Sequence, residues 1–355
     1  MKLIKQQRLY TALIGAALAL AAVPVFAEES GAGEAVVAEV NADASAVEER
    51  KDSRLETSIS FGAAWYPEVQ HTTASGTHFM PLCGAYDGAE AAIKGAVSYT
   101  MPFLQADNML MEDNSLTLEA ALQVSPVTVT PSLSVTVSPL AVLELSVGGE
   151  AGSGWSWDFF NFQGAGEYSL EKQKYVGFSP FEHWYLHGWA SATLMFDTGA
   201  IWEGDWTHVV MVATYEVGYQ KMTGTSNVWQ WKSSSYPMAN GWIYRQEYFL
   251  GYQMPLPLSI VGVDVELSGH YSASDFAVSG IDESYDGDFM RIDISLVAQY
   301  KLDKAGKNAI GMYACVSSRR SFAEEWKDWD TEPLLTKNGR EFFFESVGVE
   351  WKHIF

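Results

Sequence analysis

Twelve segments in which apolar and polar residues alternate predict an all-β chain that closes into a transmembrane, antiparallel, up-and-down β-barrel. Many of these segments approach the roughly ten residues with which a tilted strand crosses a bilayer, whereas strands of soluble sheets usually have about five or six. Aromatic residues make up 14% of the chain. Trp and Tyr favour the interface between hydrocarbon and water, so this load fits the two aromatic belts of a membrane barrel.

The chain begins with a predicted secretory signal peptide, residues 1–27. Lys2, Lys5 and Arg8 give it a basic start, an apolar run follows, and residues 25–27 form a small-residue cleavage pattern. This leader predicts export, and it is excluded from the fold. No later stretch has the length and apolar character of a membrane-spanning helix.

Residues 28–54 are rich in Ala, Glu and Val and contain no aromatic residue. This composition predicts a flexible, acidic segment in the periplasm ahead of the barrel. The alternative is a plug that lies inside the barrel. The barrel itself is predicted to span residues 55–355.

The alternation is clearest in the tenth segment, where Met290, Ile292 and Ile294 stand against Arg291 and Asp293. The connections alternate between mostly long and short, as outer loops and periplasmic turns do in barrels with an even strand number. The predicted strands are 55–66, 92–103, 115–125, 128–138, 140–149, 183–196, 207–220, 242–254, 258–271, 289–302, 308–316 and 341–355.

The fourth segment contains a feature that conflicts with a closed sheet. Pro126 and Pro131 lie beside it and within it, and proline has no N–H for the strand ladder. A closed barrel has no edge strand where this loss would be harmless. We therefore expect a β-bulge near the outer rim.

The last segment reads EFFFESVGVEWKHIF and ends the chain on Phe355. Val347, Val349 and Trp351 share its apolar face. This ending resembles the closing strand of bacterial outer-membrane β-barrels, although no specific family within that class is indicated. The resemblance implies an envelope of the Gram-negative type, a location in the outer membrane with both barrel termini in the periplasm, and Phe355 as the assembly signal. It also implies outer-membrane lipids, periplasmic chaperones and the barrel-assembly machinery as partners.

A soluble β-sandwich would show the same alternation, because its apolar face points to a core and its other face to water. The length of the segments, the aromatic residues near their ends and the final Phe355 favour the barrel.

The net charge of −22, from 44 acidic and 22 basic side chains, argues against polyanionic partners. Such a chain repels nucleic acid and anionic surfaces. Among common functional motifs, neither a phosphate-binding loop nor a zinc-protease or serine-hydrolase signature is present. The sequence therefore predicts no cofactor, no metal site and no enzymatic activity.

If the apolar faces meet lipid, the polar faces line the lumen. The tight connection 255–257 places Arg245 opposite Glu266, and Glu247 opposite Asp264. These charges predict either a network that keeps the lumen rigid or an electronegative constriction that favours cations. The candidate lumen residues are Arg245, Glu247, Asp264, Glu266, Arg291, Asp293, Glu216, Glu144, Glu119 and Lys94.

The predicted function is a narrow channel for the passive diffusion of small solutes, with a charged and slightly cation-favouring lumen. The alternative is a closed-lumen barrel whose aromatic and acidic surface loops serve adhesion or envelope structure. The sequence does not specify the oligomeric state.

The loop 150–182 is unusually aromatic, with Trp155, Trp157, Phe159 and Phe160 close together. We expect it to fold over the mouth of the barrel or into the lumen. Its rings could also form a contact surface for a ligand or another cell.

The two cysteines, Cys83 and Cys315, fall on the same side of the predicted barrel. An exported chain permits a disulfide, so these residues are candidates for one between a loop and the rim.

His270-Tyr271-Ser272 resembles the His-x-Ser of the twelve-stranded outer-membrane phospholipase. The predicted phase turns His270 and Ser272 inward, whereas that family's catalytic pair faces lipid, and a matching Asn is missing. A lipid esterase is therefore the least favoured function.

Overall fold

The structure is a computed structural model that describes residues 53–68, 74–80, 88–108, 110–156, 164–232, 236–277, 281, 285–323 and 334–355. The predicted signal peptide and nearly all of the acidic segment 28–54, with the plug hypothesis attached to it, lie outside the described residues.

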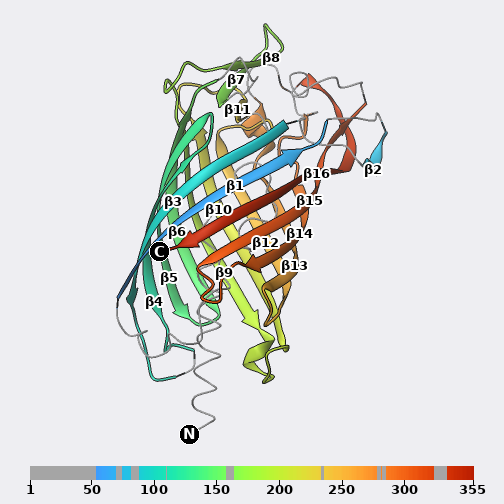
Figure 1. The fold of residues 1–355 in the computed structure, drawn as a ribbon. Helices are drawn as coiled ribbons and strands as arrows, with labels where there is room; N and C mark the ends of the chain where they lie inside the picture. The colour runs from blue at the N-terminus through green and yellow to red at the C-terminus, as the bar shows by residue number, and fades with distance from the viewer. Residues whose placement is uncertain are drawn as a thin grey trace.

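Twelve antiparallel strands form a closed ring, in which each strand pairs with its neighbours in chain order and the first pairs with the last (Figure 1). The predicted fold class and all twelve predicted strands are confirmed. The strands of the ring are β1 (Arg54–Tyr66), β3 (Gly88–Pro102), β4 (Ser115–Val124), β5 (Thr128–Leu140), β6 (Leu143–Gly154), β9 (Tyr185–Asp197), β10 (His208–Met222), β12 (Gly241–Gln253), β13 (Leu258–His270), β14 (Arg291–Lys301), β15 (Asn308–Phe322) and β16 (Lys337–Ile354).

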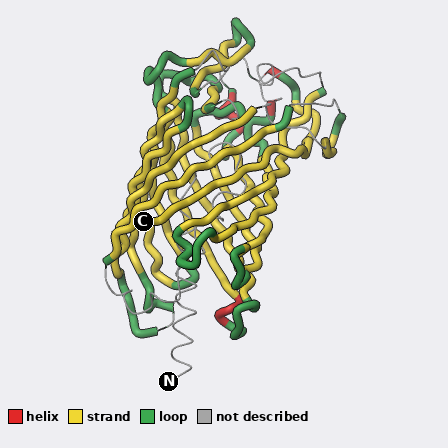
Figure 2. The backbone as a smooth tube through the Cα atoms, viewed as in Figure 1, coloured by secondary structure: helices red, strands yellow, loops and turns green. Residues whose placement is uncertain are grey.

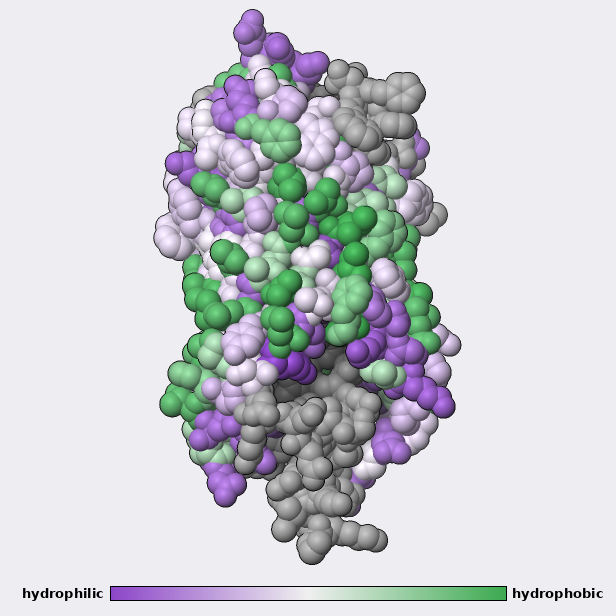
Figure 3. All heavy atoms as spheres, turned by 60° about the vertical axis from the view of Figure 1, so that its left-hand side comes forward, coloured by the Kyte–Doolittle hydropathy of each residue, from purple (hydrophilic) through white to green (hydrophobic). Residues whose placement is uncertain are grey.

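The outer face of the ring is apolar, because alternate residues of each strand point away from the lumen. Leu133 is 67% exposed, Leu296 is 64% exposed, and Phe61, Val97 and Leu250 on other strands are also exposed. In the space-filling view, hydrophobic atoms gather around the middle of the molecule and hydrophilic atoms toward its two ends (Figure 3). This is the surface that a bilayer covers.

The two ends of the barrel differ. The end named here the turn end carries the short connections, such as 254–257 and 302–307, whereas the cap end carries the long ones (Figure 2). Three short strands at the cap end form a separate sheet: β7 (Ala165–Ser169), β8 (Lys174–Gly177) and β11 (Trp229–Trp231). No helix among the described residues is long and apolar enough to cross a membrane.

The cap end has an apolar core of its own. One cluster joins the small sheet to the tops of the strands and contains Trp229, Trp231, Tyr185 and Met222. A second cluster gathers buried side chains from several connections, among them Tyr168, Val228, Phe276, Tyr285 and Leu335. The connections therefore form an ordered structure, which we call the cap, on one end of the barrel.

A further strand, β2 (Gly76–Met80), runs parallel to the upper part of β16. β1 pairs with β16 only from Val347 to Ile354, so β1 leaves the same edge of β16 without a partner above that point. β2 pairs with residues 339–343 on this edge. It thus continues the wall where β1 leaves it.

The expected bulge at the prolines is not where the sequence analysis placed it. β5 and β6 keep one register on both sides of Pro131, and the ladder simply lacks pairs between Val129 and Ser132. The shift between these strands occurs instead at Val137 and Leu140, at the turn end. The sheet accommodates the missing N–H of Pro131 by a local gap in hydrogen bonding.

A bulge does occur in β16. Cys315 pairs with Ser346, but the next residue of β15, Val316, pairs with Phe344, so Glu345 is the extra residue. This insertion shifts the alternation of β16. Glu341, Phe343 and Glu345 consequently face the lumen above the bulge, and Gly348 and Glu350 face it below.

Candidate functional site

The lumen has two unlike walls. The inward side chains of β12 to β16, here called the packed wall, are for the most part buried; Asp293, Ser295, Gln299 and Glu345 have no exposed surface. The inward side chains of β3 to β6, here called the polar wall, are in large part small and partly exposed. The barrel is therefore filled on one side and partly open on the other.

The polar wall is lined by hydroxyl groups and a few charges. Ser98, Glu119, Ser134 and Gly148 form a row of directly paired residues across β3, β4, β5 and β6, and all four are partly exposed. Lys94 Nζ lies 3.6 Å from Glu119 Oε1. Water therefore reaches the middle of this wall although its side chains point away from the lipid face.

The packed wall carries three carboxylates side by side. Glu247 pairs with Glu266, and Glu266 pairs with Asp293, in one row across β12, β13 and β14. Neighbouring like charges repel each other unless cations lie between them. Arg245 and Arg291 occupy the adjacent row and supply those cations.

Arg245 connects two of these carboxylates. Its Nε donates to Glu266 Oε2 at 2.6 Å, and its Nη2 donates to Glu247 Oε2 at 3.1 Å. The predicted contact between Arg245 and Glu266 is thus present, but the predicted register is wrong by two residues. Arg245 pairs with Ser268, and Phe249, not Glu247, pairs with Asp264.

The reason for the shift is the geometry of the hairpin. The backbone N–H of Met254 donates to the carbonyl of Ser259 at 2.7 Å, so the loop closes two residues later on β13 than the predicted tight connection would. An irregularity between Leu258 and Ile260 then adjusts the pairing of β13 with β14.

Arg291 joins two carboxylates of the packed wall in the same way. Its Nε donates to Asp293 Oδ1 at 2.9 Å, and its Nη2 donates to Glu345 Oε1 at 2.5 Å. Tyr236, from the connection between β11 and β12, lies over this guanidinium with its ring centroid 4.0 Å away. A segment of the cap end therefore reaches into the lumen and covers the packed wall.

A third pair lies higher on the packed wall. Arg319 Nε donates to Glu341 Oε1 at 2.8 Å, and Glu341 Oε2 lies 3.0 Å from His78 Nε2 of β2. The Phe343 ring lies 4.2 Å from the guanidinium carbon of Arg319. Strand β2 is therefore held to β16 by side chains as well as by backbone pairing.

The remaining predicted lumen residues do face inward. Glu144 and Asp264 are buried, and Glu216 pairs directly with Arg245. Strict alternation missed Glu341 and Glu345, because it turns them toward lipid. Their charge could have revealed the error, since a carboxylate that faces hydrocarbon is costly. Two such residues imply that the inward and outward positions of the strand are exchanged in this part of the chain.

The predicted aromatic loop is described only in part. Trp155 lies with its ring centroid 5.4 Å from that of Phe181, whereas Trp157, Phe159 and Phe160 lie outside the described residues. Among the cap residues that the structure describes, the most deeply buried rings are those of Trp229 and Trp231, from a different connection.

The predicted disulfide is not formed. Cys315 is a free, buried thiol on the packed wall, and its Sγ donates to Glu345 Oε2 at 3.2 Å. Cys83 lies outside the described residues. Cys315 sits below the bulge of β16, among the ion pairs of the lumen, and not at the rim.

The His-x-Ser motif does not bring its two residues together. His270 Nδ1 lies 2.9 Å from Asp275 Oδ2, and His270 Nε2 accepts from Gln220 Nε2 at 3.1 Å. Ser272 Oγ instead hydrogen-bonds with Ser274 Oγ at 2.7 Å. Both ring nitrogens of His270 therefore have partners other than Ser272.

The ring closure, the apolar outer face and the charged interior together define a transmembrane β-barrel of the outer-membrane class. Only a closed barrel lets strands cross hydrocarbon with every backbone group paired.

No family model matches the chain, and no curated protein matches it in sequence. Among solved structures, the chain is similar to the NanC porin, with 8% identity, a TM-score of 0.35, and coverage of 83% of this chain and 98% of that one. It is similar to a FadL homologue of Pseudomonas aeruginosa, with 11% identity, a TM-score of 0.34, and coverage of 96% and 97%. It is also similar to the β domain of the Bordetella autotransporter BrkA, with 8% identity, a TM-score of 0.38, and coverage of 85% and 100%. At such TM-scores, the class rests on the chain's own ring closure and surface.

Proposed function

We propose that the barrel is a narrow channel for passive diffusion of small solutes across the outer membrane. The observation that carries this proposal is the partial exposure of the polar wall, where Ser98, Glu119, Ser134 and Ser146 point inward and are partly exposed at mid-barrel. Side chains that only filled a closed core would be buried, as those of the packed wall are.

The packed wall limits what passes. Charged pairs and the Tyr236 ring fill the lumen beside β12 to β16, so the path lies along β3 to β6. A path bordered by only part of the ring suits ions and small polar solutes, and excludes folded or bulky molecules.

We further propose a weak preference for cations. On the packed wall, Arg245 and Arg291 face the carboxylates of Glu247, Glu266, Asp293 and Glu345, which leaves a surplus of negative charge. On the polar wall, Glu119 and Lys94 balance each other. The field of the packed wall therefore favours cations in the path beside it.

The orientation proposed for the barrel places the cap outside the cell and the turn end in the periplasm. The long connections gather at the cap end, and Phe355 and Arg54 lie toward the other end. Cleavage by an external protease in whole cells tests this orientation. Cleavage within the cap connections supports it, and cleavage within the turns contradicts it.

Planar bilayers containing the purified, refolded barrel test the channel. We expect steady single-channel steps. Under a salt gradient, we expect a reversal potential whose sign shows that cations are more permeant than anions. Glu119→Gln should reduce the cation preference, because it leaves Lys94 uncompensated beside the path. Asp107→Asn, which removes an exposed carboxylate from a turn, is the matched control and should behave as wild type. A silent bilayer with folded protein contradicts the proposal.

The second candidate function is a closed barrel whose surface serves adhesion or envelope structure. The ordered cap favours it, because Trp229, Trp231 and Tyr168 are buried in cores that belong to the cap itself. A silent bilayer, together with binding of whole cells to a surface that is lost on removal of the cap, would support this candidate.

A further inference from the structure

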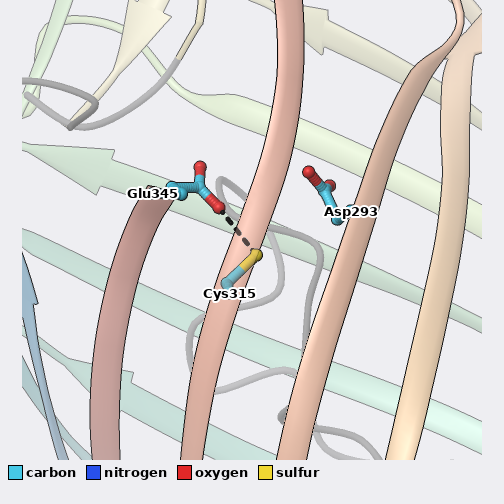
Figure 4. Close-up of side chains that lie close together, drawn as sticks. All are labelled: Asp293, Cys315 and Glu345. Carbon is cyan, nitrogen blue, oxygen red and sulfur yellow. Dashed lines mark hydrogen bonds between the residues drawn. The ribbon is translucent and has the colours of Figure 1, made fainter. Parts of the chain in front are cut away.

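Three side chains of the packed wall bring metal-binding atoms together outside the proposed path. One carboxylate oxygen of Asp293, Sγ of Cys315 and one carboxylate oxygen of Glu345 all lie within 4.8 Å of one another. The carboxylates flank the sulfur, as Figure 4 shows. All three residues are buried.

The sheet positions these residues on three adjacent strands. Ser295 of β14 pairs with Cys315 of β15, which pairs with Ser346 of β16. Asp293 lies two residues from Ser295 on the same inner face. The bulge of β16 adds Glu345 beside Ser346, so a carboxylate and a hydroxyl lie next to the thiol. Bulges often re-aim side chains at functional sites.

Arg291 holds one oxygen of each carboxylate. It donates to Asp293 Oδ1 and to Glu345 Oε1, and Ser317 Oγ also hydrogen-bonds to Asp293 Oδ1. Glu345 Oε2 is left for the Cys315 thiol at 3.2 Å. Carboxylates that bind a metal ion are commonly hydrogen-bonded by outer-shell groups, and Arg291 would take that role here.

The second oxygen of Asp293 supplies an independent indication. Asp293 has no exposed surface, yet its Oδ2 has no hydrogen-bond partner. The Ser346 Oγ, also fully buried, lacks one as well. Buried oxygen atoms are nearly always paired, and a site for an ion is one of the accepted explanations for exceptions.

The charges agree with a divalent ion. Two carboxylates and the Arg291 guanidinium leave one negative charge when the thiol is protonated. If a divalent ion binds Sγ, the thiol proton leaves to solvent. The two positive charges of the ion and the negative charge of the thiolate then bring the four side chains and the ion to a net charge of zero. Buried charge is tolerated when it is compensated in this way.

We propose that Asp293, Cys315 and Glu345 bind a divalent, thiophilic transition-metal ion of the Zn²⁺ type. One thiolate with oxygen ligands suits borderline-soft metals and does not suit Mg²⁺ or Ca²⁺, which prefer oxygen ligands alone. The Ser346 hydroxyl or a water molecule completes the coordination. The bound ion joins β14, β15 and β16 at the bulge.

Titration of the refolded barrel in detergent, after removal of metal with a chelator, tests this site. Cd²⁺ is the probe, because its bond to a thiolate absorbs in the ultraviolet. We expect one saturable equivalent in the wild type and in Cys83→Ser, and loss of the band in Cys315→Ser. Absence of a one-equivalent band in the wild type, or its retention in Cys315→Ser, would overturn the proposal.

The oxygen ligands are tested separately. Asp293→Asn and Glu345→Gln should each weaken Cd²⁺ binding by tenfold or more, whereas Glu144→Gln, a buried lumen carboxylate elsewhere in the ring, should leave it unchanged. Equal affinity in all three variants contradicts the assignment. Heat-modifiable migration in gels verifies that each variant is folded.

A second readout keeps Cys315 intact. In Cys83→Ser, Cys315 is the one remaining cysteine, so a thiol reagent reports on it alone. Zn²⁺ should slow its modification several-fold in Cys83→Ser, and Mg²⁺ at the same concentration should not. The protection should weaken when Asp293→Asn is added. Equal rates with and without Zn²⁺ would contradict the site.

Discussion

Individual aromatic residues of the lumen lie flat against glycines of the neighbouring strand. Tyr313 pairs directly with Gly348, and a Cβ at that glycine would lie 2.1 Å from the Tyr313 ring. Trp189 covers Gly148 in the same way. These glycines let large rings lie along the wall of the barrel.

Gly348→Ala should destabilise the barrel by about 1–3 kcal/mol, because the new methyl group forces the buried Tyr313 ring from its place. Urea unfolding of the refolded protein measures the effect. Gly95→Ala is the control: a Cβ there has open space around it, so its unfolding midpoint should stay equal or rise slightly. Equal midpoints for Gly348→Ala and wild type would contradict the packing.

Asp303 in the turn after β14 predicts a pH effect at the turn end. Its pKa lies below the ordinary value, mainly because the Asn308 side-chain amide donates to the carboxylate, with further donation from the backbone N–H groups of Lys307 and Asn308. A lowered folded-state pKa stabilises the fold above the unfolded pKa of about 3.9. This stability is lost as the pH falls through the folded pKa.

Asp303→Asn should therefore lower the urea midpoint at neutral pH, and the difference from wild type should shrink as the pH falls below about 4. Unfolding curves over a pH series measure it. A difference that does not change with pH would show that the carboxylate charge is not involved.

At the level of single residues, alternation predicted correctly which side chains enter the lumen on strands without bulges, such as Glu119 and Asp293. It did not predict their contacts. The pairing of Arg245 depended on where one hairpin closes, and a one-residue change in that loop moves each pair along the strand.

Among the elements, β15 and β16 form the longest pair of the ring and extend past their neighbours toward the cap. Arg319 and Glu341 lie between these extensions, and both are almost fully buried. Removing one partner of a buried ion pair lowers the stability of the fold more than removing one partner of an exposed pair.

Arg319→Ala should cost about 3–5 kcal/mol, because it leaves the Glu341 carboxylate buried without its main partner. The double variant Arg319→Met with Glu341→Leu should recover much of that loss. Arg54→Ala is the control, since Arg54 is largely exposed near Glu56 and its loss should cost less than about 1 kcal/mol. Unfolding free energies in detergent give the comparison, and similar losses for Arg319→Ala and Arg54→Ala would contradict it.

The last residue of the chain, Phe355, allows assembly in cells to be tested separately from the stability of the folded barrel. The Phe355 side chain is 67% exposed, and its main ring contact is the edge of His353 at 4.7 Å. If the assembly machinery reads this ring, Phe355→Ala should reduce the folded barrel in cells several-fold and leave refolding in detergent unchanged. Leu302→Ala, another exposed apolar residue at the turn end, is the control. Equal cellular amounts of both variants would contradict the assembly role.

The element that the sequence could not predict is the bulge of β16. Strict alternation assumes that no extra residue is inserted into a strand. Counting back in twos from Val347 therefore placed Glu345 on the outer face. Glu345 and the β2 pairing lie at or above this insertion, and the free thiol of Cys315 lies directly below it. The short strands β7, β8 and β11 were missed because their three to five residues are too few to show alternation.

At the scale of the whole molecule, the cap and the lumen are mechanically connected. Trp231 is fully buried, stacks on Tyr185 of β9 at 5.1 Å and fills the space above Gly152. The small sheet is therefore fixed to the barrel wall through this ring.

Trp231→Ala should loosen the cap, because removing a buried Trp costs about 3–5 kcal/mol of packing. We expect larger or noisier single-channel currents in planar bilayers. Trp206→Ala, an exposed residue near the turn end, should leave the currents unchanged. Identical traces for wild type and Trp231→Ala would show that the cap does not restrict the path.

The strand β2 has a consequence for how copies of this molecule meet. β1 contributes only eight pairs to β16, the shortest ladder of the ring, and the leftover backbone of β16 would be a template for any passing strand. Because β2 fills that template from within the same chain, residues 339–343 offer no growing point for fibrils. The exposed edge passes to β2, whose five residues make it a poor template for another strand.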